Sequence, residues 1–173
     1  MKSTLITVFL CIILTTVAQG MATTLPSACG DDKVKFDVSL QEGQPSAPTA
    51  SPEKATLIFV QRMGTCIGCS TTRIGLDGSW VGADRGNGYF AVLVSPGEHN
   101  VCASWFAPLA RMENKIGLTE LQAEAGQMYY FEIEVGSRGA NEAPVMRLKP
   151  ISGDMGAFLV SRSKTSVATP QNK

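Results

Sequence analysis

The chain has 173 residues, with 15 Lys and Arg against 15 Asp and Glu and a single His. This length suits one domain, and a hydrophobic content of 44% is enough to bury a core, which argues against both a disordered chain and a large multidomain enzyme. A formal net charge of zero argues against the cationic field that nucleic-acid binding requires, so we expect no nucleic-acid partner.

Residues 1–20 have the layout of a secretory signal peptide. One positive charge, Lys2, precedes an apolar stretch over residues 5–17, and small residues follow at Ala18 and Gly20. We expect cleavage after Gly20, with Ala22 as the alternative. The stretch is shorter than the roughly 20 residues of a membrane span, so we expect no span after signal removal. The prediction is a periplasmic or secreted bacterial protein.

A lipid-anchored form is the less favoured alternative. Cys29 follows small residues in the run LPSAC, as an acylated cysteine does. However, the apolar stretch ends more than ten residues earlier, and Pro26 occupies a position where such signals usually carry Leu.

The expected domain organisation places a short N-terminal segment ahead of one main domain. Residues 21–41 contain the alternation of Val34, Phe36 and Val38 with charged residues, which predicts a half-buried strand. Residues 42–54 are rich in Pro, Ser and Ala and indicate a flexible linker.

The main domain is expected over residues 55–162 as a series of short strands. Turn signals at Asp77-Gly78, Asn87-Gly88 and Pro96-Gly97 separate β-branched and aromatic runs. The expected strands cover residues 55–62, 72–76, 79–83, 89–95, 98–105, 128–135 and 145–148. In residues 128–135 the alternation predicts one face toward the core, with Tyr130, Glu132 and Glu134 toward water.

Near the C-terminus, Ser152 is expected to cap a short helix in which Met155, Phe158 and Leu159 share one face. Residues 163–173 are polar and are expected to form a disordered tail. Seven to nine short strands with at most one short helix predict an all-β fold, an antiparallel β-sandwich or barrel.

Three runs stand out in the main domain: GLDGSWVG at 75–82, GYFAVLVSPGEHNVCASW at 88–105 and LTELQAEAGQMYYFEIEV at 118–135. Together they resemble an uncharacterised bacterial family, domain-of-unknown-function family 2846, and the resemblance covers about residues 54–160. It implies an exported small β-sandwich similar to transthyretin-type and carboxypeptidase-regulatory modules. The family brings no catalytic residues to carry over. The Cys66 and Cys69 pair and the N-terminal segment with Cys29 depart from its pattern.

After signal removal four cysteines remain: Cys29, Cys66, Cys69 and Cys102. In an exported protein an even count predicts disulfides, and four cysteines allow three connectivities. The favoured prediction pairs Cys29 with one of the other three, which would pin the N-terminal segment across the linker, and pairs the remaining two.

Two alternatives give Cys66 and Cys69 a chemical role. A redox pair of this spacing has its first thiol at a helix N-terminus, whereas this pair lies between expected strands. A metal site would need further ligands such as Cys29, Cys102 or His99. We therefore expect no metal and no cofactor.

No catalytic constellation is recognisable, so we expect a protein that is not an enzyme. His99 is interpreted as a surface strand histidine because no nucleophile is identifiable beside it. The possible binding surface comprises Trp80, His99 and Tyr130, although core packing is the simpler interpretation of Trp80. The predicted function is a non-catalytic structural or interaction module of the cell envelope, with an envelope protein or a small ligand as partner.

Overall fold

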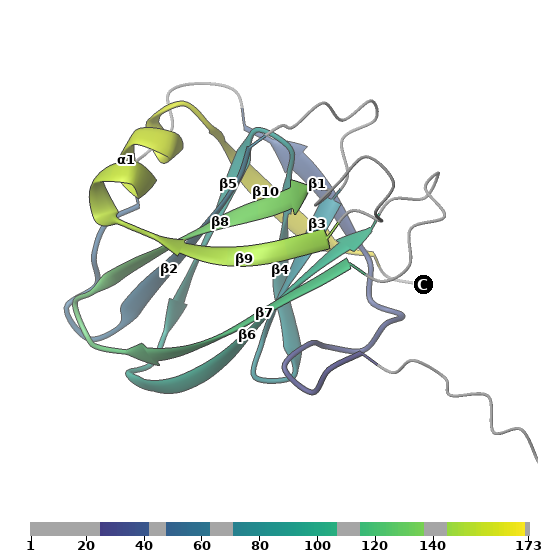
Figure 1. The fold of residues 1–173 in the computed structure, drawn as a ribbon, viewed down its shortest axis with the longest axis horizontal. Helices are drawn as coiled ribbons and strands as arrows, with labels where there is room; N and C mark the ends of the chain where they lie inside the picture. The colour runs from purple at the N-terminus through teal and green to yellow at the C-terminus, as the bar shows by residue number, and fades with distance from the viewer. Residues whose placement is uncertain (1–24, 42–47, 63–70, 107–114, 137–144, 172–173) are drawn as a thin grey trace, which may run out of the picture.

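The computed structural model describes residues 25–41, 48–62, 71–106, 115–136 and 145–171 (Figure 1). Within these ranges the chain forms ten strands and one helix. They are β1 (Phe36–Leu40), β2 (Ala55–Gln61), β3 (Thr71–Leu76), β4 (Ser79–Arg85), β5 (Gly88–Val94), β6 (Gly97–Phe106), β7 (Lys115–Ala123), β8 (Met128–Gly136), β9 (Val145–Ile151), α1 (Gly153–Ser161) and β10 (Lys164–Pro170). The predicted all-β class with one short helix is confirmed.

The strands form two sheets that face each other as a sandwich. One sheet has six strands in the order β1-β10-β5-β2-β8-β9, and the other has four in the order β4-β3-β6-β7. Six of the eight strand pairings are antiparallel, while β2 with β8 and β5 with β10 are parallel. In each parallel pair, the chain between the two strands passes through strands of the other sheet. Such a long connection allows the chain to return in the same direction beside the first strand.

The tight turns follow the sequence prediction. Asp77 and Gly78 join β3 to β4 with φ of 49° and 86°, a left-handed pair that Asp and Gly tolerate. Asn87 has φ of 64° just before β5, and Gly97 has φ of 136° at the start of β6. These turns set the register of successive strands.

The main core lies between the sheets and is centred on β2 and β8. The rings of Phe59 and Phe131 stack with centroids 5.3 Å apart. Around them pack buried apolar side chains from both sheets: Leu57, Ile74, Val94, Val101, Ala103, Ile133, Met146 and Leu148. This core buries one face of each strand that lines it. The opposite face of each strand can therefore be covered by a different part of the chain.

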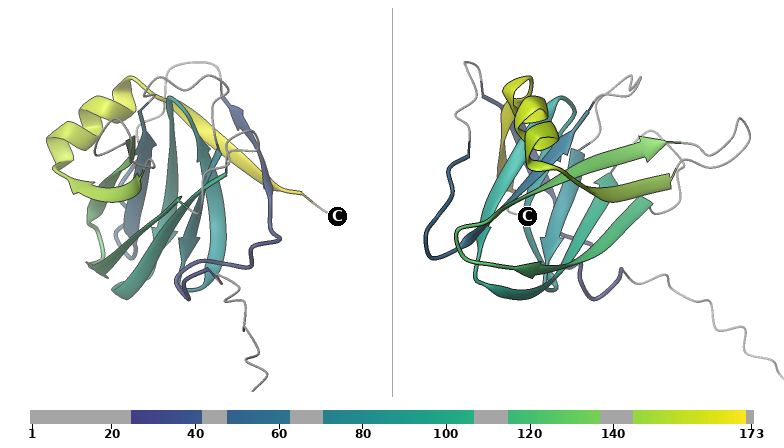
Figure 2. Two further views of the ribbon diagram at one scale, coloured as in Figure 1. Left: turned by 45° about the vertical axis from the view of Figure 1, so that its right-hand side comes forward. Right: turned by 60° about the vertical axis from the view of Figure 1, so that its left-hand side comes forward.

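A second, smaller core lies under α1, on the outer face of the six-stranded sheet. Leu159 and Val160 of the helix pack against Ile58, Val60 and Tyr89. This covering explains why β2 is buried along its whole length. Figure 2 shows α1 on the opposite side of the molecule from residues 25–35.

The helix begins as predicted, but it presents a different face. Ser152 is the N-cap, and its side chain accepts a hydrogen bond from the Met155 amide. Met155 and Phe158, which the sequence predicts to share one face with Leu159, are 50% and 54% exposed, whereas Leu159 is buried, so the three do not form one packed face. Gly156 lies against the sheet instead, because only a residue without a side chain allows the helix backbone to approach the Tyr130 ring.

The same contact corrects the prediction for the outer face of β8. Tyr130 is partly buried and packs within the second core rather than pointing freely to water. Glu132 is 5% exposed and is paired with Arg62. Alternation along a strand predicts which side chains share a face, but it does not predict whether that face is buried. In this protein both faces of β8 are covered by other parts of the chain.

We expect Gly156→Ala to destabilise the protein by about 1–3 kcal/mol, because the added methyl group would overlap the Tyr130 ring. This loss should exceed the helix-propensity gain of about 1 kcal/mol for replacing Gly by Ala. Gly153→Ala is the matched control, since nothing lies within 4 Å of its added methyl group. Urea unfolding checks both variants, and equal stability of Gly156→Ala and wild type would contradict this account of the helix packing.

The predicted disordered tail from Ser163 is wrong, because Lys164–Pro170 forms β10. This strand pairs antiparallel with β1 and parallel with the start of β5. The strand is polar, so its sequence lacks the apolar alternation that predicts a strand. Its buried residue is Ser166, which donates a hydrogen bond to the polar side chain of Asp84. The strand count therefore exceeds the seven to nine expected. Of the expected linker, residues 48–54 contain no strand or helix, and residues 42–47 lie outside the described part.

Candidate functional site

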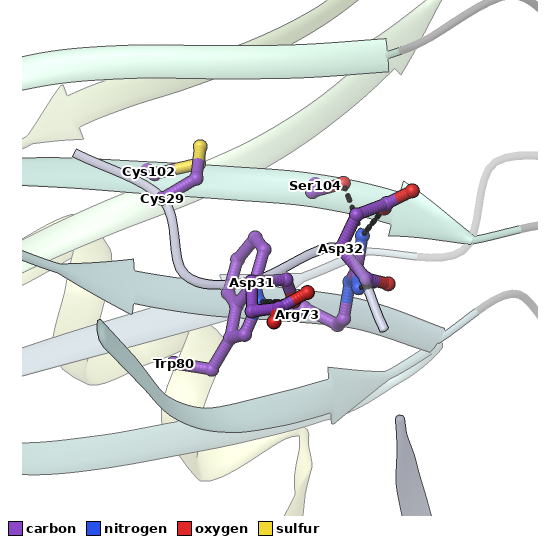
Figure 3. Close-up of a disulfide and its surroundings, with 7 residues drawn as sticks. All are labelled: Cys29, Asp31, Asp32, Arg73, Trp80, Cys102 and Ser104. Atoms are coloured by element: carbon purple, nitrogen blue, oxygen red, sulfur yellow. Dashed lines mark hydrogen bonds and ion pairs between the residues drawn. A yellow bond between two sulfur atoms is a disulfide. The ribbon is translucent and has the colours of Figure 1, made fainter. Parts of the chain in front are cut away.

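The N-terminal strap, residues 29–35, crosses the outer face of the four-stranded sheet (Figure 3). It begins at Cys29, which forms a disulfide with Cys102 of β6, with Cα atoms 5.3 Å apart. Both cysteines are buried, at 5% and 0% exposure. The predicted pairing of Cys29 with another cysteine is confirmed, and the bonded sulfur is not available for a lipid. Cys66 and Cys69 lie outside the described residues.

Arg73 of β3 holds the middle of the strap. Its Nη1 donates to the backbone oxygens of Asp32 at 3.0 Å and Val34 at 2.8 Å. Its Nη2 donates to the Asp32 carboxylate at 3.2 Å and to Ser104 Oγ at 3.3 Å. Since the Arg73 side chain is only 8% exposed, these oxygens replace the water that the guanidinium loses. Sequence reasoning did not predict this role for Arg73, because one Arg within a strand gives no signal of its distant partners.

Trp80 completes this attachment from β4. Its Nε1 donates to the backbone oxygen of Asp31 at 2.7 Å, and the Arg73 guanidinium lies 4.4 Å from the centre of its ring. Trp80 is half-buried, so it belongs neither to the core between the sheets nor to an open binding surface. Further along, Arg85 Nη1 donates to the backbone oxygen of Val38, which continues the attachment into β1.

A pocket of about 330 Å³ opens between residues 26–28, which lead into the strap, and the paired strands β6 and β7. We call it the strap pocket. Its lining residues are Pro26, Ser27, Ala28, Asn100, Val101, Leu118, Thr119 and Glu120. The disulfide joins the two walls, because Cys29 follows Ala28 and Cys102 follows Val101.

His99 clamps two hairpin turns together. Its Nδ1 lies 2.7 Å from the Asp77 carboxylate, and its Nε2 lies 2.7 Å from the backbone oxygen of Ser95. Both partners are acceptors, so both ring nitrogens must donate, and the doubly protonated imidazolium is the form that fits. Both ring nitrogens of His99 are therefore engaged in these two contacts.

Electrostatics support the same form. Partial burial alone would lower the pKa of His99, but its hydrogen bonds to Ser95 and Asp77 and the charge of Asp77 together raise that pKa above 6.5. Partial burial alone would raise the pKa of Asp77, but hydrogen bonds from His99 and from the Asn100 amide and the charge of His99 together lower that pKa.

We expect Asp77→Asn to lower the pKa of His99, measured by NMR titration of the ring of this single histidine. The His99 contribution to stability is fully present below its unfolded pKa near 6.5 and is lost as the pH rises through the folded pKa. The Asp77 contribution is present above 3.8 and is lost as the pH falls through its lowered pKa. Glu134→Gln, on the other sheet, is the control. An unchanged His99 titration in Asp77→Asn would contradict the clamp.

A buried acid lies between the sheets where β4 meets β10. Asp84 is 0% exposed, and its Oδ1 accepts from Ser166 Oγ at 2.5 Å and from the Arg85 amide at 2.8 Å. Its Oδ2 has no hydrogen-bond partner among the described residues. Burial raises the pKa of Asp84 to about 7, although hydrogen bonds from Ser166 and from the backbone of Arg85 and Gln61 act against the rise. Sequence reasoning missed this acid because it read the region as a strand ending in a turn.

The three residues of the predicted binding surface are not brought together. Trp80 lies on the outer face of the four-stranded sheet, and Tyr130 lies under α1 on the opposite sheet. His99 sits at the start of β6, next to the turns. Among the described residues, no group of three or more His, Cys, Asp or Glu is placed to hold a metal ion.

No protein-family model matches the chain, and comparison with curated proteins and with solved structures finds no match. In the part of the chain that the structure describes, no helix is long and apolar enough to cross a membrane.

Proposed function

We propose that this protein is an exported, non-catalytic β-sandwich module that acts structurally or as an interaction domain in the bacterial cell envelope. The observation that carries the proposal is the buried Cys29–Cys102 disulfide, which fastens the N-terminal strap to the sheet. Structural disulfides persist in oxidising compartments such as the periplasm and the exterior. The signal-type sequence of residues 1–20 points to the same compartments.

The roles of the polar side chains support a non-catalytic module. Arg73 and Trp80 bind backbone oxygens of the strap, and His99 joins two turns. These contacts give the three side chains a role in stabilising the fold. A catalytic site would instead need such groups to converge on the position of a reacting atom. The resemblance to family 2846 and to transthyretin-type modules stays a prediction. The redox or metal alternative at Cys66 and Cys69 falls on residues outside the described part, and no contact described above favours it.

The test of export uses the full chain expressed with its own leader in a bacterial host. We expect recovery outside the cytoplasm, a mass that lacks residues 1–20 or 1–22, and a non-reduced peptide joining Cys29 to Cys102. Leu14→Arg, within the apolar stretch, is the control that should keep the protein in the cytoplasm with both thiols reduced. Cytoplasmic retention of the wild-type protein with a free Cys29 would overturn the proposal.

The catalytic alternative has a separate test, in which the purified protein is assayed for reduction of a small aromatic disulfide. We expect no activity that depends on Cys66. Loss of a measurable thiol-exchange rate in Cys66→Ser, with the fold intact by circular dichroism, would establish the redox function instead.

A further inference from the structure

Covalent and hydrogen bonds hold one wall of the strap pocket in place. This wall consists of Pro26, Ser27 and Ala28, and the disulfide that follows Ala28 ties it to β6. A further hydrogen bond joins the Gly78 amide to the Ala28 oxygen at 3.2 Å. A cavity held open by covalent and hydrogen-bonded walls is preorganised, which lowers the entropic cost of binding.

The other wall carries a definite pattern of side chains. Asn100 and Glu120 are direct partners across β6 and β7, and two residues further along β6 Cys102 is the partner of Leu118. Residues two apart in a strand share a face, so Leu118 and Glu120 lie on the strap side together with Asn100 and Cys102. Two hydrogen bonds to Asp77 hold the backbone of Asn100. The backbone N–H of Asn100 donates to the Asp77 carboxylate at 2.8 Å, and the backbone oxygen of Asn100 accepts from the backbone N–H of Asp77 at 3.0 Å.

The chemistry of the lining favours one class of ligand. Glu120 supplies a carboxylate, and none of the eight lining residues is basic. Asn100, the cross-strand partner of Glu120, adds a side-chain amide whose oxygen is a further acceptor. Leu118, with 53% of its surface exposed, and Pro26 provide apolar contacts. A volume of about 330 Å³ is at the lower end of ligand pockets, so the site suits a small group rather than a large ligand.

We propose that the strap pocket binds an ammonium or guanidinium group carried on a short aliphatic chain. The cation pairs with the Glu120 carboxylate and the Asn100 amide oxygen, and the aliphatic chain lies against Leu118 and Pro26. Such a group occurs in free organic amines and in the Lys or Arg side chain of a partner protein. The inference rests on the proposed interaction function and names the chemistry of its ligand.

The experiment is an NMR titration of the whole mature protein, with its disulfide oxidised, with two cationic probes. Butylguanidinium represents the free cation, and the tripeptide acetyl-Gly-Arg-Gly-amide represents a partner's side chain. Butanol and butyrate are the uncharged and anionic controls. We expect saturable shifts of the amides of Asn100, Leu118 and Glu120 with at least one cationic probe and with neither control.

Which probe binds distinguishes the sources. Binding of the tripeptide, alone or with greater affinity, indicates a partner protein, while binding of butylguanidinium alone indicates a free organic cation. Saturation by neither cationic probe at millimolar concentration overturns the proposal. It would leave export and the disulfide intact, so failure of the pocket is separable from failure of the proposed function.

Variants then test the site itself. Glu120→Gln should weaken binding about fivefold, because it removes a partly exposed charge pair. Leu118→Ser should weaken binding about threefold through lost apolar contact. Both residues are exposed, so neither change should unfold the domain. Glu98→Gln removes the same charge from the same strand pair outside the pocket. An equal effect of Glu98→Gln and Glu120→Gln would show a general negative field and would overturn the pocket.

Discussion

Replacing the buried acid, Asp84→Asn, is expected to stabilise the protein by roughly 2–4 kcal/mol at pH 8 and to change its stability little at pH 4. The estimate follows from the raised pKa of Asp84, about 7 against 3.8 in the unfolded chain, at about 1.4 kcal/mol per unit. Asn keeps the acceptor that Ser166 and the Arg85 amide use, but it carries no charge into the interior.

The sign follows from proton binding. Between pH 3.8 and about 7 the folded state holds the Asp84 proton more tightly than the unfolded state does. Wild-type stability therefore falls as the pH rises through this window and levels off above it. Asp84→Asn removes this slope, so the two stability curves should meet at acid pH and separate toward pH 8.

Urea unfolding at pH 4, 6 and 8 measures this difference. Asp37→Asn, an exposed acid on β1, is the control and should show no comparable pH-dependent gain. Ser166→Ala should destabilise more at pH 8 than at pH 4, because it removes a donor that favours the ionised carboxylate. A destabilised Asp84→Asn at pH 8 would show that the Asp84 charge is compensated by groups beyond those described.

Loss of the disulfide is expected to destabilise the protein by about 4 kcal/mol. Cys29 and Cys102 are 73 residues apart, and closing a loop of this size restricts the unfolded chain by about that amount in the loop-closure model. The paired variant Cys29→Ala with Cys102→Ala avoids a buried hydroxyl or a lone thiol. Chemical unfolding of oxidised wild type and of this variant checks the loss.

Hydrogen exchange locates the effect. We expect the amides of the strap and of β3 to lose protection in the paired variant, while those of β2 and β8 exchange only through global unfolding. Cys66→Ser with Cys69→Ser is the control for the removal of two cysteines elsewhere in the chain. If the paired variant kept full stability, Arg73 and Trp80 alone would hold the strap, and the disulfide would have no stabilising role.

Much of the local structure followed from the sequence because it depends on neighbouring residues. Asp77-Gly78 gave the β3–β4 turn, since few residue pairs tolerate two positive φ angles in succession. Ser152 marked the start of α1, since an N-cap needs only the amides of the next turn. The signal-type sequence of residues 1–20, and the four cysteines that remain without it, predicted a disulfide before any fold was known.

Only the tertiary structure decided the contacts between distant segments. Asp37 meets Gln171 across 134 positions, and Asp84 meets Ser166 across 82, so the polar C-terminal residues become a strand that no local pattern indicates. Gly156 and Glu132 are buried for the same reason, through partners on another element. Turns and caps are set by sterics within a few residues, whereas burial and pairing depend on which surfaces meet once the chain has folded.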